Sequence, residues 1–356
     1  MAAILLALCG CRTLEFYTQA LQGQLEILHR QQPIEALLSN AETPETLKEK
    51  LEIVQLARGF AEKRLGLPVD GHYRKYADLK RPFVVWNVEA APRFSMEPKG
   101  WWYPFVGRLE YRGYFREKNA REYAEALRRK GYDVHVSGAS AYSTLGWFKD
   151  PVLNTFLFDS DTDVLETLFH ELAHQRLFVA GDKDFNEAFA TLVAREGVRR
   201  WLRTLHRNDE YERFLARTRR EDDFAGLVLT ARRQLEALYG DQRDQDGRIR
   251  ASRRNAEAAT AGLLAGKEKV FAELREQYAL LKARWNQPGE YEDWFSQPIN
   301  NAKLNSVAAY HELVPGFQKL LDLHDGNLPE FYEEVERLTR LAREERHARI
   351  RALQDN

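Results

Sequence analysis

One short segment of the sequence has residue types and spacing that could hold a metal ion. His170 and His174 are four positions apart, and Glu171 directly follows the first, giving the pattern H-E-x-x-H. On an α-helix, residues i and i+4 lie on one face, about 6 Å apart at Cβ. Two imidazoles placed in this way can reach one zinc ion at roughly 2.0–2.1 Å. The alternative is a surface helix that bears two solvated histidines.

Glu171 is rotated by about 100° around the helix from His170. It is too close in sequence to the two histidines to serve as a third ligand beside them. It is instead placed to accept a proton from a metal-activated water molecule and to pass it to a leaving amine. We therefore expect Glu171 to be the catalytic base.

Glu187 is the candidate for the third ligand. A catalytic zinc ion usually takes three protein ligands and keeps a fourth position open. Glu187 follows a turn at Gly181 and falls in the first turn of the next predicted helix. Two antiparallel helices packed about 8–10 Å apart could bring it to the histidine pair. The alternative is an acidic residue that complements the helix dipole; Glu166 and Glu196 are weaker ligand candidates.

The elements that must position these residues are two helices, predicted at about 161–178 and 184–204. The first has an apolar side and three candidate N-cap residues. The apolar side consists of Val164, Leu165, Leu168, Phe169 and Leu172, and the cap candidates are Asp159, Ser160 and Asp161. The histidines should face away from this apolar side, toward a cleft.

Patterns elsewhere predict an α+β, predominantly helical fold with four parts. Residues 1–11 resemble a signal, and 12–79 form a helical hairpin with a second helix from Pro44 to Leu65, capped by Thr43 and stopped by Gly66. Residues 80–205 form an α+β, zincin-like core with strands near 83–88, 101–115 and 133–136 and a helix from Arg116 to Lys130. Residues 206–356 are helical, with a long charged hairpin at 210–286.

Composition limits the possible functions. The formal net charge is −1 and no basic patch dominates a region, so nothing indicates nucleic-acid binding. The two cysteines are Cys9 and Cys11, which leaves the body of the chain without a thiolate site. A metal ion there must be held by His, Asp or Glu.

The N-terminal residues indicate a membrane anchor. The apolar run from Ala2 to Leu8 is far shorter than the about 20 residues that a membrane-spanning helix needs. Leu8-Cys9-Gly10 before Cys11 resembles a bacterial lipoprotein cleavage box, which predicts lipidation of Cys11 and a location in the bacterial cell envelope, facing the periplasm. No Lys or Arg precedes the apolar run. The alternative is the first turn of a cytoplasmic helix.

The metal motif resembles that of the gluzincin peptidases, which are thermolysin-like or aminopeptidase N-like. His170-Glu171-x-x-His174 is followed by Asn186-Glu187-Ala188-Phe189-Ala190, and the resemblance implies that Glu187 binds zinc. The interval between His174 and Glu187 is shorter here than in those two groups.

Nearly the whole chain resembles a family of bacterial proteins described as predicted aminopeptidases, which are often lipoproteins. Besides the metal motif, the matching segments are Cys11, Gly113-Tyr114-Phe115, the run from Ala141 to Phe148 with Asp150-Pro151, and Asn300-Asn301-Ala302 with Tyr310 near Val314-Pro315. This resemblance implies peptidase activity on peptides with a free N-terminus.

Amide hydrolysis also needs a hydrogen-bond donor for the oxyanion. Tyr310 is the first candidate and His311 the second; the alternative is that Tyr310 is an ordinary half-buried helical tyrosine. Residues 140–147 could form a sheet edge along which a peptide lies, with Tyr142 and Trp147 lining the cleft. No Glu that could bind an α-amino group occurs between Ala139 and Phe148.

We therefore expect a zinc (Zn²⁺) peptidase, favour an aminopeptidase, and expect a peptide substrate. The ligands would be His170, His174 and Glu187, and the catalytic residues Glu171 and Tyr310. A zinc endopeptidase remains an alternative. So does a non-catalytic periplasmic interaction lipoprotein with a relict metal site, which the long charged helices motivate.

Overall fold

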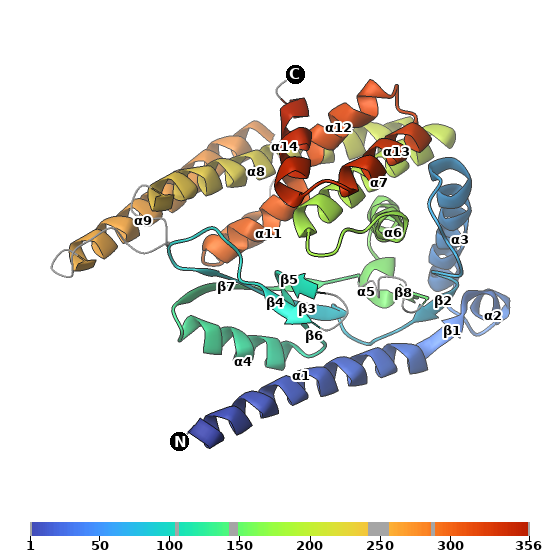
Figure 1. The fold of residues 1–356 in the computed structure, drawn as a ribbon. Helices are drawn as coiled ribbons and strands as arrows, with labels where there is room; N and C mark the ends of the chain where they lie inside the picture. Colours follow the sequence, from blue (N-terminus) through green and yellow to red (C-terminus); the bar gives the residue numbers. More distant parts are fainter. Residues whose placement is uncertain (1, 104–106, 142–148, 241–255, 286–288, 355–356) are drawn as a thin grey trace.

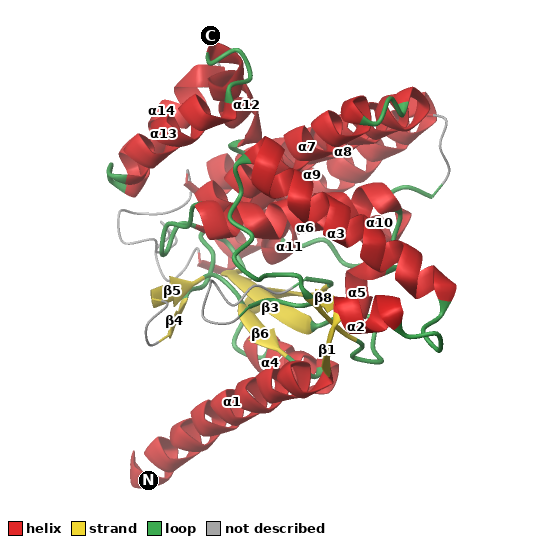
Figure 2. Ribbon diagram, turned by 90° about the vertical axis from the view of Figure 1, so that its right-hand side faces the viewer, coloured by secondary structure: helices red, strands yellow, loops and turns green. Residues whose placement is uncertain are grey.

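The computed structural model describes residues 2–103, 107–141, 149–240, 256–285 and 289–354 (Figure 1). In these residues the fold is predominantly helical with three small sheets. This confirms the prediction of an α+β, predominantly helical fold. The helices form most of the body, and the strands lie to one side of the helices that carry the metal motif (Figures 1 and 2).

The N-terminal elements pack on different parts of the fold. Helix α1 (Ala2–Arg30) contacts strands β2 and β6, whereas α3 (Glu45–Leu65) packs on α6. Between them lie β1 (Gln31–Pro33) and α2 (Ile34–Ser39). Helix α3 has almost the predicted bounds and ends at Gly66, whose φ of 65° is the left-handed conformation that favours glycine. The predicted cap at Thr43 is wrong, because the cap position is Pro44.

The largest sheet has the strand order β6-β3-β7, with β3 (Val85–Pro92) antiparallel to both β6 (Arg112–Tyr114) and β7 (Tyr132–Ala139). The pairing with β7 continues to Pro92, so β3 lies later in the chain than the predicted strand at 83–88. Helix α4 (Glu117–Arg128) packs on one side of this sheet and α11 (Asn301–His311) on the other (Figure 1). The sheet thereby brings β3 next to α11.

The other two sheets are small. Strand β2 (Lys75–Ala77) pairs with β1 and with β8 (Val152–Leu153), and β4 (Trp101–Tyr103) forms a hairpin with β5 (Gly107–Leu109). The aromatic stretch at 101–115 thus contains three short strands rather than one or two. Residues 142–148, which include most of the predicted peptide-binding edge, lie outside the described residues.

Most of the remaining chain is helical. Its helices are α5 (Asn154–Leu157), α6 (Asp161–Arg176), α7 (Lys183–Thr204), α8 (Asn208–Gly240), α9 (Ala256–Trp285), α10 (Glu292–Ser296), α12 (Val314–Leu323), α13 (Leu328–Thr339) and α14 (Arg343–Gln354). Helices α8 and α9 pack against each other as the long charged hairpin predicted at 210–286 (Figure 1). Within the described parts of the chain, no helix has both the length and the hydropathy needed to cross a membrane.

The main core lies around α6 and α7. All five residues of the predicted apolar side of α6 are buried, and they share one cluster with Phe185, Phe189 and Val193 of α7. Residues of α3, α12 and α13 are among the other members of this cluster. Burial of one side of α6 leaves its histidines at the margin of the core, since they project from a different side of the helix.

Candidate active site

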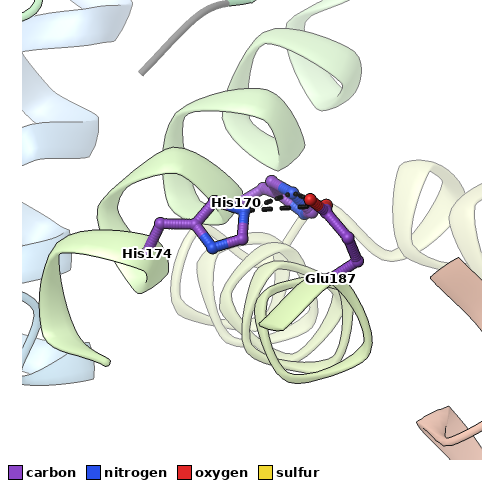
Figure 3. Close-up of side chains that lie close together, drawn as sticks. All are labelled: His170, His174 and Glu187. Carbon is purple, nitrogen blue, oxygen red and sulfur yellow. Dashed lines mark hydrogen bonds and ion pairs between the residues drawn. The ribbon is translucent and has the colours of Figure 1, made fainter. Parts of the chain in front are cut away.

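Helices α6 and α7 carry three side chains that converge on one point. His170 and His174 project from α6, and Glu187 reaches them from α7 (Figure 3). Both helices begin at a capped end: the Ser160 side chain accepts from the Asp163 N–H, and the Asp182 side chain accepts from the Phe185 N–H. Ser160 was one of the predicted caps. Glu187 is the fifth residue of α7, so it follows the first turn instead of lying within it.

The spacing of the three donor atoms fits a zinc ion. The two Nε2 atoms of His170 and His174 are 3.1 Å apart. Glu187 Oε2 lies 3.2 Å from His170 Nε2 and 3.6 Å from His174 Nε2. In a tetrahedral site with bonds of about 2.0–2.1 Å, the ligand atoms are roughly 3.3–3.4 Å apart. The three residues therefore form a suitable donor set, two nitrogens and one oxygen.

The Glu187 carboxylate of the cluster stays ionised in this environment. Burial alone would raise the pKa of Glu187, but His174 and His170 hold it well below its ordinary value. Burial would lower the pKa of His174, and the Glu187 carboxylate more than offsets this. The cluster thus contains a carboxylate that stays ionised, which is the form that binds a metal ion.

Glu171 lies beside the cluster with part of its carboxylate unused. Its Oε2 atom is buried and has no hydrogen-bond partner among the described residues. Burial is the largest effect on its pKa, which is raised although the two histidines oppose the shift. A raised pKa brings a carboxylate closer to neutral pH, where a general base works best.

Tyr310, at the C-terminal end of α11, lies next to His170. Its ring stacks on that of His170, with 6.1 Å between centroids and 28° between planes, and 38 % of the residue is exposed. Glu187 and then burial raise its pKa well above the ordinary value, so the phenol keeps its proton. A neutral phenol ring therefore lies against the His170 imidazole.

His311 belongs to a different environment. Burial and the neighbouring Arg195 lower its pKa to about 4, and its Nδ1 atom is buried without a hydrogen-bond partner in the described structure. Arg195 itself pairs with Glu221 and Asp222 of α8. Of the two predicted donors, the structure brings Tyr310 to the histidine pair.

The weaker ligand candidates are engaged elsewhere. Glu166 pairs with Arg217 of α8, and Glu196 pairs with Arg200 at 2.7 Å. Tyr142 and Trp147 lie outside the described residues. Cys11 is part of α1.

Two charged residues that sequence reasoning missed stand next to the site. Lys183, one turn before Glu187 on α7, donates to Glu89 Oε1 of β3 at 2.7 Å. Its ammonium lies 5.5 Å from the ring centre of Tyr111 and 6.0 Å from that of Tyr310. Burial would lower the pKa of Lys183, but Glu89, with Glu187 and Tyr111, raises it, so the ammonium stays charged. The sequence did contain one signal for this pair, because Glu89 is the single carboxylate in the mostly apolar run Val84–Ala91.

Of three comparisons with known proteins, one gives a match. Neither the curated proteins nor the solved structures that were searched give a significant match to the chain. One family model matches residues 15–350, which is most of the chain and includes all the site residues from His170 to Tyr310. The chain therefore belongs to the protein family described as "Putative aminopeptidase".

Proposed function

We propose that the chain is a zinc-dependent peptidase of the aminopeptidase type, with His170, His174 and Glu187 as the zinc ligands. The observation that carries the proposal is the convergence of their three donor atoms, all within 4.8 Å of one another. The family description supports peptide hydrolysis. A zinc ion in this position would supply Lewis acidity, which polarises a carbonyl group and lowers the pKa of water.

Glu171 acts as the general base in this proposal. Its buried Oε2 atom has no hydrogen-bond partner in the described structure, so it is free to accept a proton from the attacking water molecule. It then passes the proton to the nitrogen of the leaving amine as the C–N bond breaks. The raised pKa of Glu171 favours both transfers, since the group must take up and release a proton within one cycle.

Tyr310 is the proposed donor to the oxyanion. A neutral phenol beside His170 can donate a hydrogen bond to the oxygen that gains charge when the carbonyl carbon is attacked. The raised pKa of Tyr310 keeps this proton in place at neutral pH.

Glu171→Gln provides the sharpest test of the assignment. The variant keeps all three proposed ligands and nearly the same shape but loses the base. Elemental analysis should find about one zinc per chain in both the wild type and the variant. On a panel of short peptides, the variant should be about 10²–10⁴-fold slower than the wild type. A chain without zinc overturns the proposal, whereas zinc without hydrolysis of any peptide favours the non-catalytic alternative.

A matched pair of substrates tests the exopeptidase part. An aminopeptidase should cleave a peptide with a free N-terminus and lose activity on the same peptide after N-acetylation. Equal rates on both would identify an endopeptidase.

We also propose that Cys11 carries a lipid that holds the chain at the bacterial cell envelope. Support comes from the residues around Cys11, which resemble a lipoprotein cleavage box. Mass spectrometry of the protein from membranes should find a diacylglyceryl-modified Cys11, and Cys11→Ser should move the protein to the soluble fraction. An unmodified Cys11 in a membrane-free protein would exclude the anchor.

A further inference from the structure

A cavity of about 330 Å³ lies beside the group formed by His170, His174 and Glu187. Its walls include Glu89 of β3 and Lys183 of α7, together with residues of α8, α11 and α14 and of the segment around the β4–β5 hairpin. A volume of this size is within the range of small-ligand pockets. Its lining is unusual for such a pocket because it is rich in charge.

The charge of the lining is predominantly acidic. Among the described residues that line the cavity, six carry a carboxylate and four carry a basic side chain. Two of the basic groups are each shared between two of these carboxylates. Arg232 pairs with Glu236 at 3.0 Å and with Glu312 at 3.4 Å. Arg343 lies 3.1 Å from Asp184 and 3.7 Å from Glu110. Arg351, outside the lining, also pairs with Glu312 at 2.9 Å, which leaves a small excess of carboxylates. Such an excess favours a cationic group over an anionic one.

Glu89 offers an unused hydrogen-bond acceptor in this wall. The residue is only 8 % exposed, and its Oε1 atom accepts from Lys183. Its Oε2 atom is buried and has no hydrogen-bond partner in the described part of the chain. A buried carboxylate oxygen without a donor is costly, so a ligand that brings an N–H group to Oε2 would be held strongly.

Glu110, in the connection between β5 and β6, is a second carboxylate, and its ion pair with Arg343 is long. Arg343 Nη2 lies 3.7 Å from its Oε1 atom, too far for a hydrogen bond, and approaches Asp184 more closely, at 3.1 Å. Burial and the neighbouring Asp184 raise the pKa of Glu110. A cation in the cavity would offset both effects.

The cavity is adjacent to the position of a bound peptide. Lys183 lies one turn before Glu187, and the lining residues Ala308 and Ala309 directly precede Tyr310. When a peptide bond is held between Tyr310 and the His170–His174–Glu187 group, a neighbouring residue of the peptide can reach the cavity.

We propose that this cavity is a subsite for a cationic group of the substrate, with Glu89 and Glu110 as the carboxylates that bind it. The source of the cation rests on the proposed peptidase function: a peptide brings an N-terminal ammonium, a lysine ammonium or an arginine guanidinium. All three carry several N–H donors and a positive charge, which is what an unsatisfied carboxylate binds best.

Binding of four small amides tests the subsite without any hydrolysis. The ligands are L-norleucinamide, with an α-ammonium only; N-acetyl-L-lysinamide, with a side-chain ammonium only; L-lysinamide, with both; and N-acetyl-L-norleucinamide, with neither. Calorimetric titrations use the full chain with Glu171→Gln, so that no amide is cleaved. At least one singly charged ligand should bind about tenfold tighter than the neutral one, or better, as expected for a charge-assisted hydrogen bond.

The variants Glu89→Gln and Glu110→Gln, each added to this background, should remove most of that advantage. Glu110→Gln decides the matter if Glu89→Gln fails to fold, since Glu89 also holds Lys183. The exposed Glu276 of α9 lies outside the cavity, and Glu276→Gln should leave all four affinities unchanged.

The four ligands also separate the sources of the cation. Tighter binding of norleucinamide identifies the N-terminal ammonium, and tighter binding of N-acetyl-lysinamide identifies a basic side chain. The subsite is overturned if all four ligands bind equally, or if their order of affinity persists in Glu110→Gln. The same titrations on a His174→Ala variant, which lacks one proposed zinc ligand, separate the two proposals. Charge-dependent binding in this variant supports the subsite whether or not the wild type binds zinc.

Discussion

Gly197 of α7 lies directly against the ring of Phe169 of α6: a Cβ atom at position 197 would be 2.6 Å from Cδ2 of Phe169 and 2.8 Å from a methyl carbon of Leu65. Phe169 immediately precedes His170. The absence of a side chain at Gly197 therefore sets how closely α6, with His170 and His174, can approach α7, with Glu187.

Gly197→Ala should push α6 and α7 apart. The expected loss of stability is about 1–3 kcal/mol, as for other overpacked cores, and zinc affinity should fall with it. Urea unfolding and zinc titration measure the two effects. Gly226 of α8 is the control, since a Cβ there would meet nothing within 4 Å; Gly226→Ala should stabilise the protein by about 0.5–1 kcal/mol. A Gly197→Ala variant as stable as the wild type would refute the close-approach argument.

Zinc should raise the melting temperature of the wild type, because a ligand that binds only the folded state adds stability. At a free zinc concentration 100 times Kd, the gain is about 2.7 kcal/mol. Glu187→Ala should abolish most of this shift. Glu196→Ala, on the same helix but paired with Arg200, should keep it. Equal zinc shifts in both variants would remove Glu187 from the ligand set.

Tyr310→Phe removes one hydroxyl group and keeps the ring that stacks on His170. If the phenol stabilises the oxyanion, kcat should fall by about 10²–10³, while KM and zinc content change little. Steady-state kinetics and elemental analysis check this. Full activity in Tyr310→Phe would leave Tyr310 with a packing role only.

Asp182 joins the start of α7 to the C-terminal helix α14. Its buried carboxylate accepts from His347 Nε2 at 2.8 Å and lies 3.0 Å from Arg346 Nη1. Burial would raise the pKa of Asp182, but His347, Arg343 and Arg346 lower it below its ordinary value. Asp182→Asn leaves a buried arginine without its partner, so it should cost about 3–5 kcal/mol at neutral pH.

The stability difference between the wild type and Asp182→Asn should depend on pH with a definite sign. A carboxylate whose pKa is lowered by folding stabilises above its unfolded pKa of about 3.9, and the contribution is lost as pH falls through the folded value. Urea unfolding should therefore show a larger difference at about pH 5 than below about pH 4. Asp325→Asn, at an exposed position, should change stability by less than about 0.5 kcal/mol at any of these pH values. A difference that does not shrink in acid would contradict the ion-pair account.

Local features of the chain were predictable because short-range physics determines them. The four-residue spacing of His170 and His174 places both on one helical face, Ser160 caps that helix, and Gly66 ends α3 in the left-handed conformation. The placement of Tyr310 near the histidines could be anticipated only as one of two candidates, because neighbouring residues of a helix point in different directions. The predicted cap at Thr43 failed because proline at position 44 occupies the cap position itself.

The sequence by itself therefore determined the HExxH pattern of His170, Glu171 and His174 and the helix that carries it, since these depend on spacing within one element. Only the tertiary structure decided what meets across elements. It placed Glu89 of β3 against Lys183 of α7, 94 positions away, and Asp182 against His347, 165 positions away. Such contacts depend on how the sheet and helices pack together, and no local periodicity encodes them. The charged cavity arises in the same way, because its carboxylates come from separate elements that only the folded core brings together.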